Sequence, residues 1–233
     1  MQTGFLLINK PVDWTSHDVI GYLRKVTGIK KIGHAGTLDP FATGLLIVGI
    51  GRQATKRLDE FKALPKTYIT AMKLNAVSDT YDRTGNIKEQ IIRNKQITKK
   101  QIKDVLKSFK DKQTQLPPMY SAKKVKGKKL YELARKGIEI ERKPHKIEIY
   151  KIKLQKFKIG NLPVGKASLK LKIFCSPGTY IRTLVHDIGQ KLETGAYCEE
   201  LERTRIGKYK VKKAIEPTLV TKNNLKKFIF QLN

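Results

Sequence analysis

A loop rich in polar groups holds the side chain best suited to chemistry. Residues 33–44 read GHAGTLDPFATG and place Asp39 between Leu38 and Pro40. Proline restricts the residue before it to extended conformations, and glycines let a ligand approach the backbone closely. A carboxylate held in this way can be aimed, and it can act as a nucleophile. A lone Asp-Pro pair is more often an ordinary turn, so the aspartate alone leaves both interpretations open.

The charge of the chain indicates a polyanionic partner. Its 233 residues include 49 Lys and Arg against 20 Asp and Glu, which gives a net charge of +29. Such a surface attracts nucleic acid or an anionic membrane and releases condensed counterions on binding. Compositional drift toward lysine would also raise the charge, but the size of the excess favours nucleic acid.

The pattern of strands and helices predicted around this loop indicates an α+β fold. Alternating or continuous apolar runs predict strands at residues 4–9, 44–51, 66–74, 167–175 and 196–213. Apolar stripes and caps predict helices at 15–28, 53–62, 98–109, 130–137, from about 179 and from about 218. Two of these helices open with a capping box, Thr15 with Asp18 and Thr98 with Gln101. Residues 31–43 and 111–129 are predicted to be loops, the second of them basic.

Several classes of protein are disfavoured. No apolar run approaches the roughly 20 residues of a membrane span, and the first residues lack the pattern of a signal peptide. Cys175 and Cys198 show no metal or redox spacing, and histidines are too scattered for a catalytic zinc site. We therefore expect a cytoplasmic protein that binds no metal.

Five segments together resemble the TruB family of tRNA pseudouridine synthases and follow the order of its motifs. They are residues 9–20, 30–56, 116–137, 175–189 and 201–209. The resemblance implies the pseudouridine synthase fold, an α+β fold whose mixed, mainly antiparallel central sheet is flanked by helices. It also implies a catalytic domain over residues 1–215, with a basic RNA-binding insertion or arm at about 111–137. Residues 216–233 would form a short helical tail, without a full C-terminal RNA-binding domain.

The implied activity is the isomerisation of a uridine in the T loop of tRNA, position 55 in tRNA numbering. Asp39 aligns with the family's nucleophile, and Arg182 aligns with the arginine that pairs with it. The reaction breaks the bond between uracil N1 and ribose C1′ and rejoins the base through C5, so no redox cofactor is needed. Attack at C1′, addition at C6 and a glycal route all remain open.

The other aligned residues would contact RNA. His34 aligns with the histidine that inserts into the T loop, and Tyr68 with the tyrosine that stacks on the flipped base. Tyr180 would contact the substrate, and Leu201 would line the base pocket. Four lysines suit contacts with phosphates: Lys10, Lys123, Lys124 and Lys126.

Two alternatives stay open beside this stand-alone enzyme. One is a non-catalytic RNA-binding protein that keeps the scaffold. The other is the guide-dependent branch of the superfamily, whose members carry a sizeable C-terminal RNA-binding domain. Because only about twenty residues follow the last motif, the stand-alone enzyme is favoured. We expect its partner to be tRNA, with no obligate protein partner and no cofactor.

Overall fold

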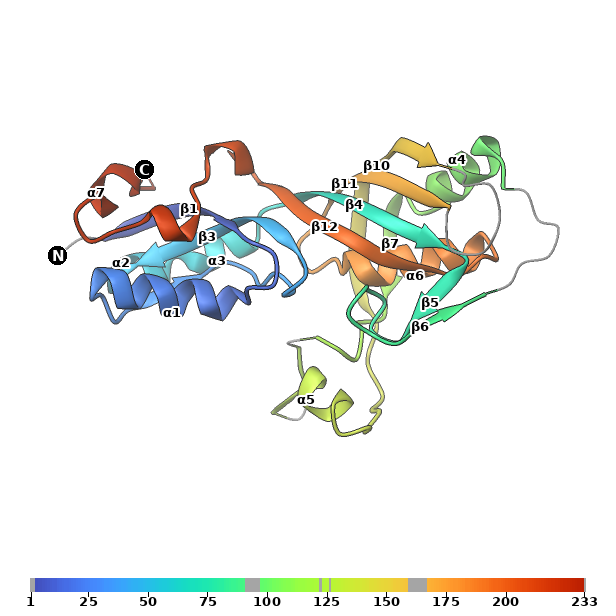
Figure 1. The fold of residues 1–233 in the computed structure, drawn as a ribbon, viewed down its shortest axis with the longest axis horizontal. Helices are drawn as coiled ribbons and strands as arrows, with labels where there is room; N and C mark the ends of the chain where they lie inside the picture. The colour runs from blue at the N-terminus through green and yellow to red at the C-terminus, as the bar shows by residue number, and fades with distance from the viewer. Residues whose placement is uncertain (1–2, 91–96, 122, 126, 159–166, 233) are drawn as a thin grey trace. The chain divides into compact units, whose positions relative to one another are not determined.

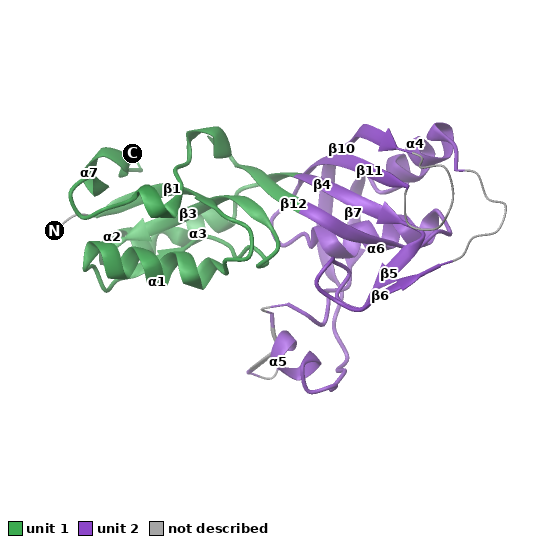
Figure 2. Cartoon of the chain, viewed as in Figure 1, with its two compact units in different colours: residues 1–68, 201–233 green, residues 69–200 purple. Residues whose placement is uncertain are grey.

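The computed structural model describes residues 3–90, 97–121, 123–125, 127–158 and 167–232 (Figure 1). Contacts divide the chain into two compact units (Figure 2). Unit 1 comprises Met1–Tyr68 and Leu201–Asn233, and unit 2 comprises Ile69–Glu200. These units are defined by contacts, whereas the expected catalytic domain over 1–215 and tail over 216–233 were defined by the family resemblance. That division stays a prediction.

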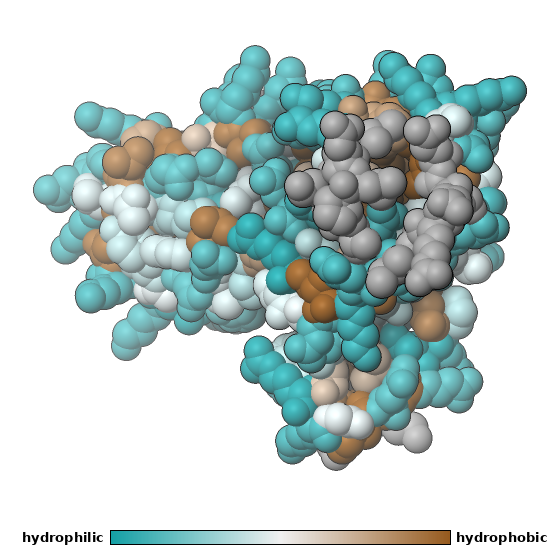
Figure 3. Space-filling model, turned by 45° about the vertical axis from the view of Figure 1, so that its right-hand side comes forward, coloured by the Kyte–Doolittle hydropathy of each residue, from teal (hydrophilic) through white to brown (hydrophobic). Residues whose placement is uncertain are grey.

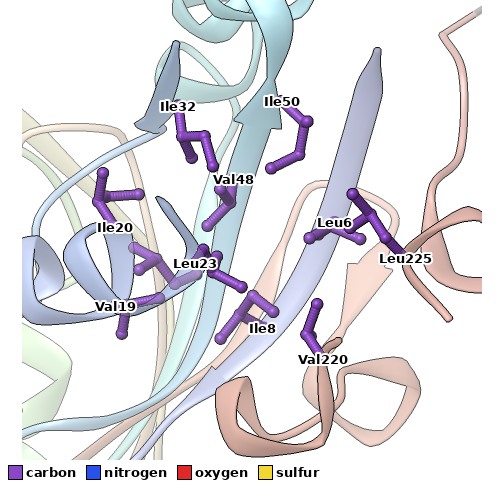
Figure 4. Packing of buried hydrophobic residues seen from close by; sticks show 11 residues of the cluster. Leu6, Ile8, Val19, Ile20, Leu23, Ile32, Val48, Ile50, Val220 and Leu225 are labelled. Carbon is purple, nitrogen blue, oxygen red and sulfur yellow. The ribbon is translucent and has the colours of Figure 1, made fainter. Parts of the chain in front are cut away.

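Unit 1 is built around a strand that is buried on both faces. This strand, β3 (Thr43–Ile50), pairs antiparallel with β1 (Gly4–Lys10) and β2 (Ile32–His34) and parallel with the end of β12 (Ala196–Ile206). Because side chains alternate along a strand, β3 supplies two hydrophobic clusters. One cluster includes Leu46, Val48 and Ile50 and packs against α1 (Ser16–Thr27) (Figure 4). The other includes Leu45 and Ile47 and packs against α2 (Gly51–Lys56) and α3 (Leu58–Lys62).

The chain after β12 completes unit 1. It forms β13 (Tyr209–Lys210), two short 3-10 turns (Val211–Lys213 and Pro217–Leu219) and α7 (Leu225–Phe228). The helix expected from about 218 is therefore much shorter than predicted. The chain leaves the helix because Phe230 pairs with Phe5, each donating its N–H to the other's carbonyl at 2.9 Å.

Unit 2 consists of a sheet with flanking helices. Its strands include β4 (Lys66–Leu74), β11 (Ser168–Cys175), β10 (His145–Lys158) and β7 (Asp111–Gln115). Its two longest helices are α4 (Lys99–Ser108) and α6 (Ile181–Lys191), and a hairpin joins β5 (Ala76–Ser78) to β6 (Ile87–Glu89). In the expected arm, β8 (Lys124–Val125) pairs with β9 (Lys128–Lys129) and α5 (Leu130–Ala134) follows.

The sheet confirms the predicted fold class. Among the described residues, nine strands form the main sheet, in the order β1-β3-β12-β4-β11-β10-β7 with β2 on β3 and β13 on β12. The pairing of β12 with β3 is parallel, whereas β3 pairs antiparallel with β1 and β2, β10 pairs antiparallel with β11 and β7, and β12 pairs antiparallel with β13. Strands β4 and β12 each contribute residues to both units.

Three segments differ from expectation. Residues 111–115 were expected in a basic loop but form β7, because their backbone pairs with β10 although DKQTQ has no apolar alternation. Residues 32–34 of the predicted 31–43 loop form β2. The helix expected at 53–62 is divided in two at Arg57, whose φ of −96° and ψ of 4° depart from helical values.

Candidate active site

The loop that carries Asp39 is fastened to the first turn of α1. Asp39 is half-buried between β2 and β3, and its carbonyl accepts a hydrogen bond from the N–H of Ala42 at 3.1 Å. The buried Ser16 hydroxyl accepts from the N–H of Leu38 at 2.9 Å and donates to the Leu38 carbonyl at 3.3 Å. The residue before the carboxylate is therefore held through both polar groups of its backbone.

Lys10 holds the residue after the carboxylate. Its side chain is fully buried, and its Nζ donates to the carbonyls of Pro11 at 2.7 Å, Trp14 at 2.5 Å and Pro40 at 3.1 Å. Burial lowers the pKa of Lys10 to about 8, against an opposing effect of the nearby Asp39 charge. The ammonium is thus a positive charge beside the candidate nucleophile.

This position differs from the one expected for Lys10. A phosphate contact was predicted for Lys10, but a fully buried ammonium that donates to three carbonyls is poorly placed to meet RNA. The physical reason is local: the backbone around Pro11 and Trp14 turns its carbonyls inward, and a buried carbonyl needs a donor. Lys10 therefore positions the Asp39 loop.

A second buried cation, for which no role was predicted from the sequence, holds the other end of the loop. Arg203 on β12 is 2% exposed, and its guanidinium donates to the carbonyls of Leu45 at 2.8 Å and Gly36 at 2.9 Å. The alternation of β12 could have indicated its inward direction, because Arg203 lies two residues after the buried Leu201.

Gly44, where the loop meets β3, allows a test of how closely the loop packs against the backbone of Arg203. Its φ is +102°, and a Cβ there would lie 2.5 Å from the Arg203 carbonyl oxygen. We expect Gly44→Ala to lower the free energy of unfolding by about 2–5 kcal/mol, from backbone strain and the clash together. Gly21→Ala is the matched control, because Gly21 lies in α1, where an added methyl group would meet nothing within 4 Å, and this variant should gain about 0.4–1 kcal/mol. Denaturant unfolding measures the free energy of unfolding of both variants. Equal changes in the two would contradict the close approach of Gly44 to the Arg203 carbonyl.

His34 lies on β2, half-buried beside the exposed His17. The two rings meet edge-on with centroids 5.5 Å apart. Burial, with a further contribution from the charge of His17, lowers the pKa of His34 to about 4. The buried Nδ1 atom has no hydrogen-bond partner within the part of the chain that the structure describes. The imidazole is therefore neutral at pH 7 and available to a ligand.

The lowered pKa of His34 gives a pH dependence. In the unfolded chain the imidazole gains a proton near pH 6.5, while in the folded chain it does so only near pH 4. The unfolded state binds more protons in this range, so stability should fall as pH drops from about 6.5 to about 4. Comparing urea unfolding of the wild type and His34→Gln isolates the contribution of His34, because the titrating groups that the two proteins share cancel. A constant difference between the two proteins over this range would contradict it.

In unit 2, Arg182 is buried in a polar cluster at the start of α6. It is 3% exposed, and its Nη1 lies 3.0 Å from Oδ2 of Asp82, which is equally buried. The guanidinium also donates to the carbonyls of Thr80 and Tyr120, each at 2.8 Å. The cluster fixes the direction of the guanidinium.

No role was predicted for Asp82 from the sequence. Its Oδ1 accepts from the Thr80 hydroxyl at 2.9 Å, the Thr84 N–H at 2.9 Å and the Thr84 hydroxyl at 2.5 Å. The bonds to Thr84 form an Asx turn, which the sequence pattern allows. No local signal showed that this turn would be buried against an arginine a hundred residues away.

Hydrogen bonds hold the backbone that carries Tyr180 and the two buried residues Tyr68 and Leu201. Tyr180 is the N-cap residue of α6, and the side-chain amide of Gln115 bonds both its N–H, at 2.8 Å, and its carbonyl, at 3.0 Å. Tyr68 on β4 is 9% exposed and Leu201 on β12 is 6% exposed. The Thr204 hydroxyl donates to the Thr67 carbonyl at 3.2 Å and so links these two strands.

The structure groups the predicted residues by unit. Unit 1 holds Asp39, His34, Tyr68 and Leu201, and unit 2 holds Tyr180 and Arg182. The predicted pairing of Asp39 with Arg182 would join the two units, and it stays a prediction. In the arm, Lys123 is half-buried, the backbone of Lys124 belongs to β8, and Lys126 lies outside the described residues.

The surface shown in Figure 3 is mainly hydrophilic. Among the helices of the described residues, none combines the length and hydrophobicity that crossing a bilayer requires.

Comparison with known proteins gives consistent matches over nearly the whole chain. The model of the TruB family pseudouridylate synthase N-terminal domain matches residues 24–181, and that of the tRNA pseudouridylate synthase B C-terminal domain matches 182–230. The tRNA pseudouridine synthase B of Clostridium tetani is 43% identical over 97% of this chain and 75% of its own length. The protein of the same name from Protochlamydia amoebophila is 48% identical over 88% of this chain and 75% of its own.

Solved structures show the same fold. A chain of a Cbf5-Nop10-Gar1 complex matches with a TM-score of 0.67 and 26% identity, over 95% of this chain and 53% of its own length. A chain of an H/ACA RNP bound to a substrate RNA containing 2'-deoxyuridine matches with a TM-score of 0.63 and 25% identity, over 95% and 52%. The present chain thus spans about half the length of these solved chains.

Proposed function

Because the chain belongs to the TruB family of pseudouridylate synthases, we propose that it converts the uridine at position 55 in the T loop of tRNA to pseudouridine, with Asp39 as the nucleophile. The curated relatives that share 43–48% of its sequence carry the name tRNA pseudouridine synthase B, which supports tRNA as the substrate. The reaction would take place in the cytoplasm, where tRNA is processed.

The observation that carries the proposal is the way the Asp39 loop is held. Ser16 fixes the residue before the carboxylate, Lys10 fixes the residue after it, and Arg203 binds the carbonyl of Gly36. A nucleophile that is aimed before the substrate arrives loses little entropy in the reaction.

The proposed reaction needs a uridine that has left its stack. Flipping a base out costs a few kcal/mol, and stacking on one aromatic side chain returns about 1–3 kcal/mol. We assign this stacking to Tyr68, with Leu201 beside it and His34 occupying the space the base leaves. Tyr180 would contact the nucleotide, and Arg182 would orient the Asp39 carboxylate by a charge-assisted bond.

The chemistry is balanced within the substrate. The bond between N1 and C1′ breaks, the base turns, and C5 bonds to C1′. C5 then loses its proton while N1 gains one, so no oxidant or reductant is consumed. The carboxylate of Asp39 can attack C1′ or C6, or it can take part in a glycal route, and all three are compatible with the proposal.

The test is incubation of the pure protein with an unmodified tRNA transcript in EDTA, followed by mapping of pseudouridine. We expect product at the single T-loop position, and none in a transcript that carries cytidine there. Binding without product would favour the non-catalytic alternative. Product that required an added guide RNA would contradict the stand-alone enzyme.

A further inference from the structure

Strands β10 and β11 lie side by side in unit 2 (Figure 1), and one face of this ladder carries a concentration of exposed lysines. We call it the lysine face. Its six lysines are all exposed: Lys151, Lys153, Lys156 and Lys158 on β10, and Lys170 and Lys172 on β11. The candidate active site uses none of them.

The strand register places some of these lysines directly opposite one another. Lys153 pairs with Lys172, and Lys156 pairs with Lys170. Side chains in such positions have Cβ atoms about 4.5–5.5 Å apart, and like charges there destabilise a sheet. Among the described residues, no carboxylate lies within salt-bridge distance of these four lysines. The free protein therefore contains a repulsion that an external anion would relieve.

A β-bulge brings the second of these pairs onto the face. Side chains of a regular strand alternate, so Lys153 would share its face with residues 155 and 157. The register shifts between Leu154 and Lys156, and Lys156 consequently stands opposite Lys170. On the other face, Leu154 pairs with Leu171 and Phe157 with Leu169. The irregularity thus separates lysines from apolar side chains.

Two exposed aromatic rings adjoin the lysines. Tyr150, at a second register shift, is 38% exposed, and Phe174 is 37% exposed. Their ring centroids lie 5.0 Å apart, and Lys151 is the cross-strand partner of Phe174. Exposed aromatic rings beside a basic groove or row are typical of surfaces that bind unstacked nucleotides.

We propose that the lysine face is a second RNA-binding surface, separate from the catalytic residues. Alternate lysines on one strand lie about 6–7 Å apart, so the face presents rows of charge suited to the phosphodiester backbone. The Tyr150–Phe174 pair at its end provides a platform for a base. The proposal rests on the proposed function only in taking tRNA as the RNA.

The test measures tRNA binding against salt concentration, using Asp39→Asn protein so that the substrate is not converted. Adding Lys153→Gln and Lys172→Gln should reduce the slope of log affinity against log salt by about 1.5–2. Between 50 and 200 mM salt the affinity of this variant should then fall about tenfold less than that of its parent. Phe174→Leu should weaken binding about fivefold or more.

The matched control removes the same charge elsewhere in unit 2. Lys103 and Lys107 are exposed on α4, and Lys103→Gln with Lys107→Gln should leave the salt slope nearly unchanged. A further variant, Lys172→Glu, distinguishes an effect on binding from an effect on stability. Because residue 172 lies opposite Lys153, the glutamate replaces a repulsion with an attraction. The midpoint of thermal unfolding should therefore rise while RNA affinity falls.

Equal slopes in the two double variants would overturn the proposal. It would also be overturned if the substitutions on the lysine face left RNA binding unchanged but abolished binding to phosphatidylserine vesicles, since the surface would then be a membrane contact. Because the readout is binding, absence of pseudouridine from wild-type reactions would reject the proposed function and leave this test intact.

Discussion

Replacement of Asp39 by asparagine is expected to stop pseudouridine formation while folding and tRNA binding persist. The amide has nearly the shape of the carboxylate but is no nucleophile, and loss of a nucleophile costs about 10⁴-fold or more in rate. Hydrogen bonds to the backbone of Leu38, Asp39 and Pro40 help to hold the loop, and these bonds remain in the variant. Release of tritium from C5 of labelled uridine in the transcript, under single-turnover conditions, measures the rate.

Two further variants show whether the position or only the charge matters. Asp39→Glu keeps the carboxylate but moves it by one methylene, and on a fixed loop a displacement of about 1 Å can cost 10²-fold. Asp59→Asn removes an exposed carboxylate that pairs with Lys62 on α3, and it should leave the rate unchanged. More than a few per cent of wild-type rate in Asp39→Asn would remove Asp39 from the role of nucleophile.

The parts of the fold that the sequence predicted well are those with local causes. The capping box of Thr15 and Asp18 forms as expected, and α1 ends at Gly28, whose φ is +72°. The second capping box, at Thr98, likewise opens α4. Residues 168–175 form a strand in which every second side chain is buried. Each of these signals depends on residues that are close in the sequence, so it can be recognised without knowing the tertiary contacts.

The parts that were missed depend on partners far along the chain. β7 forms because the backbone of β10 offers it hydrogen bonds, which no side-chain pattern in 111–115 reveals. Lys10 is buried because three carbonyls converge on it, and Arg203 because carbonyls of the Asp39 loop and β3 need donors. A charged residue normally indicates a surface, so composition argues against burial and only the folded chain shows it.

Asp82 gives the second large expected effect. Asp82→Ala should lower the free energy of unfolding by about 3–5 kcal/mol, because it leaves the guanidinium of Arg182 buried without its counter-charge. In a chain of this size that shifts the midpoint of thermal unfolding by roughly 6–20 °C. Pseudouridine formation should fall as well, since the direction of Arg182 is set by the same cluster. Calorimetry and the tritium assay measure the two effects.

The double variant Asp82→Leu with Arg182→Met distinguishes an unpaired charge from simple loss of packing. Removing both members of a buried ion pair is often neutral or stabilising, so most of the lost stability should return. Activity should not return, because Arg182 is proposed to orient the nucleophile. The control is Asp79→Ala, an exposed carboxylate whose bond to the Asn86 N–H at 2.9 Å should be worth about 1 kcal/mol. If Asp79→Ala and Asp82→Ala destabilised equally, burial of the ion pair would not be the cause. If the double variant regained activity, Arg182 would have only a structural role.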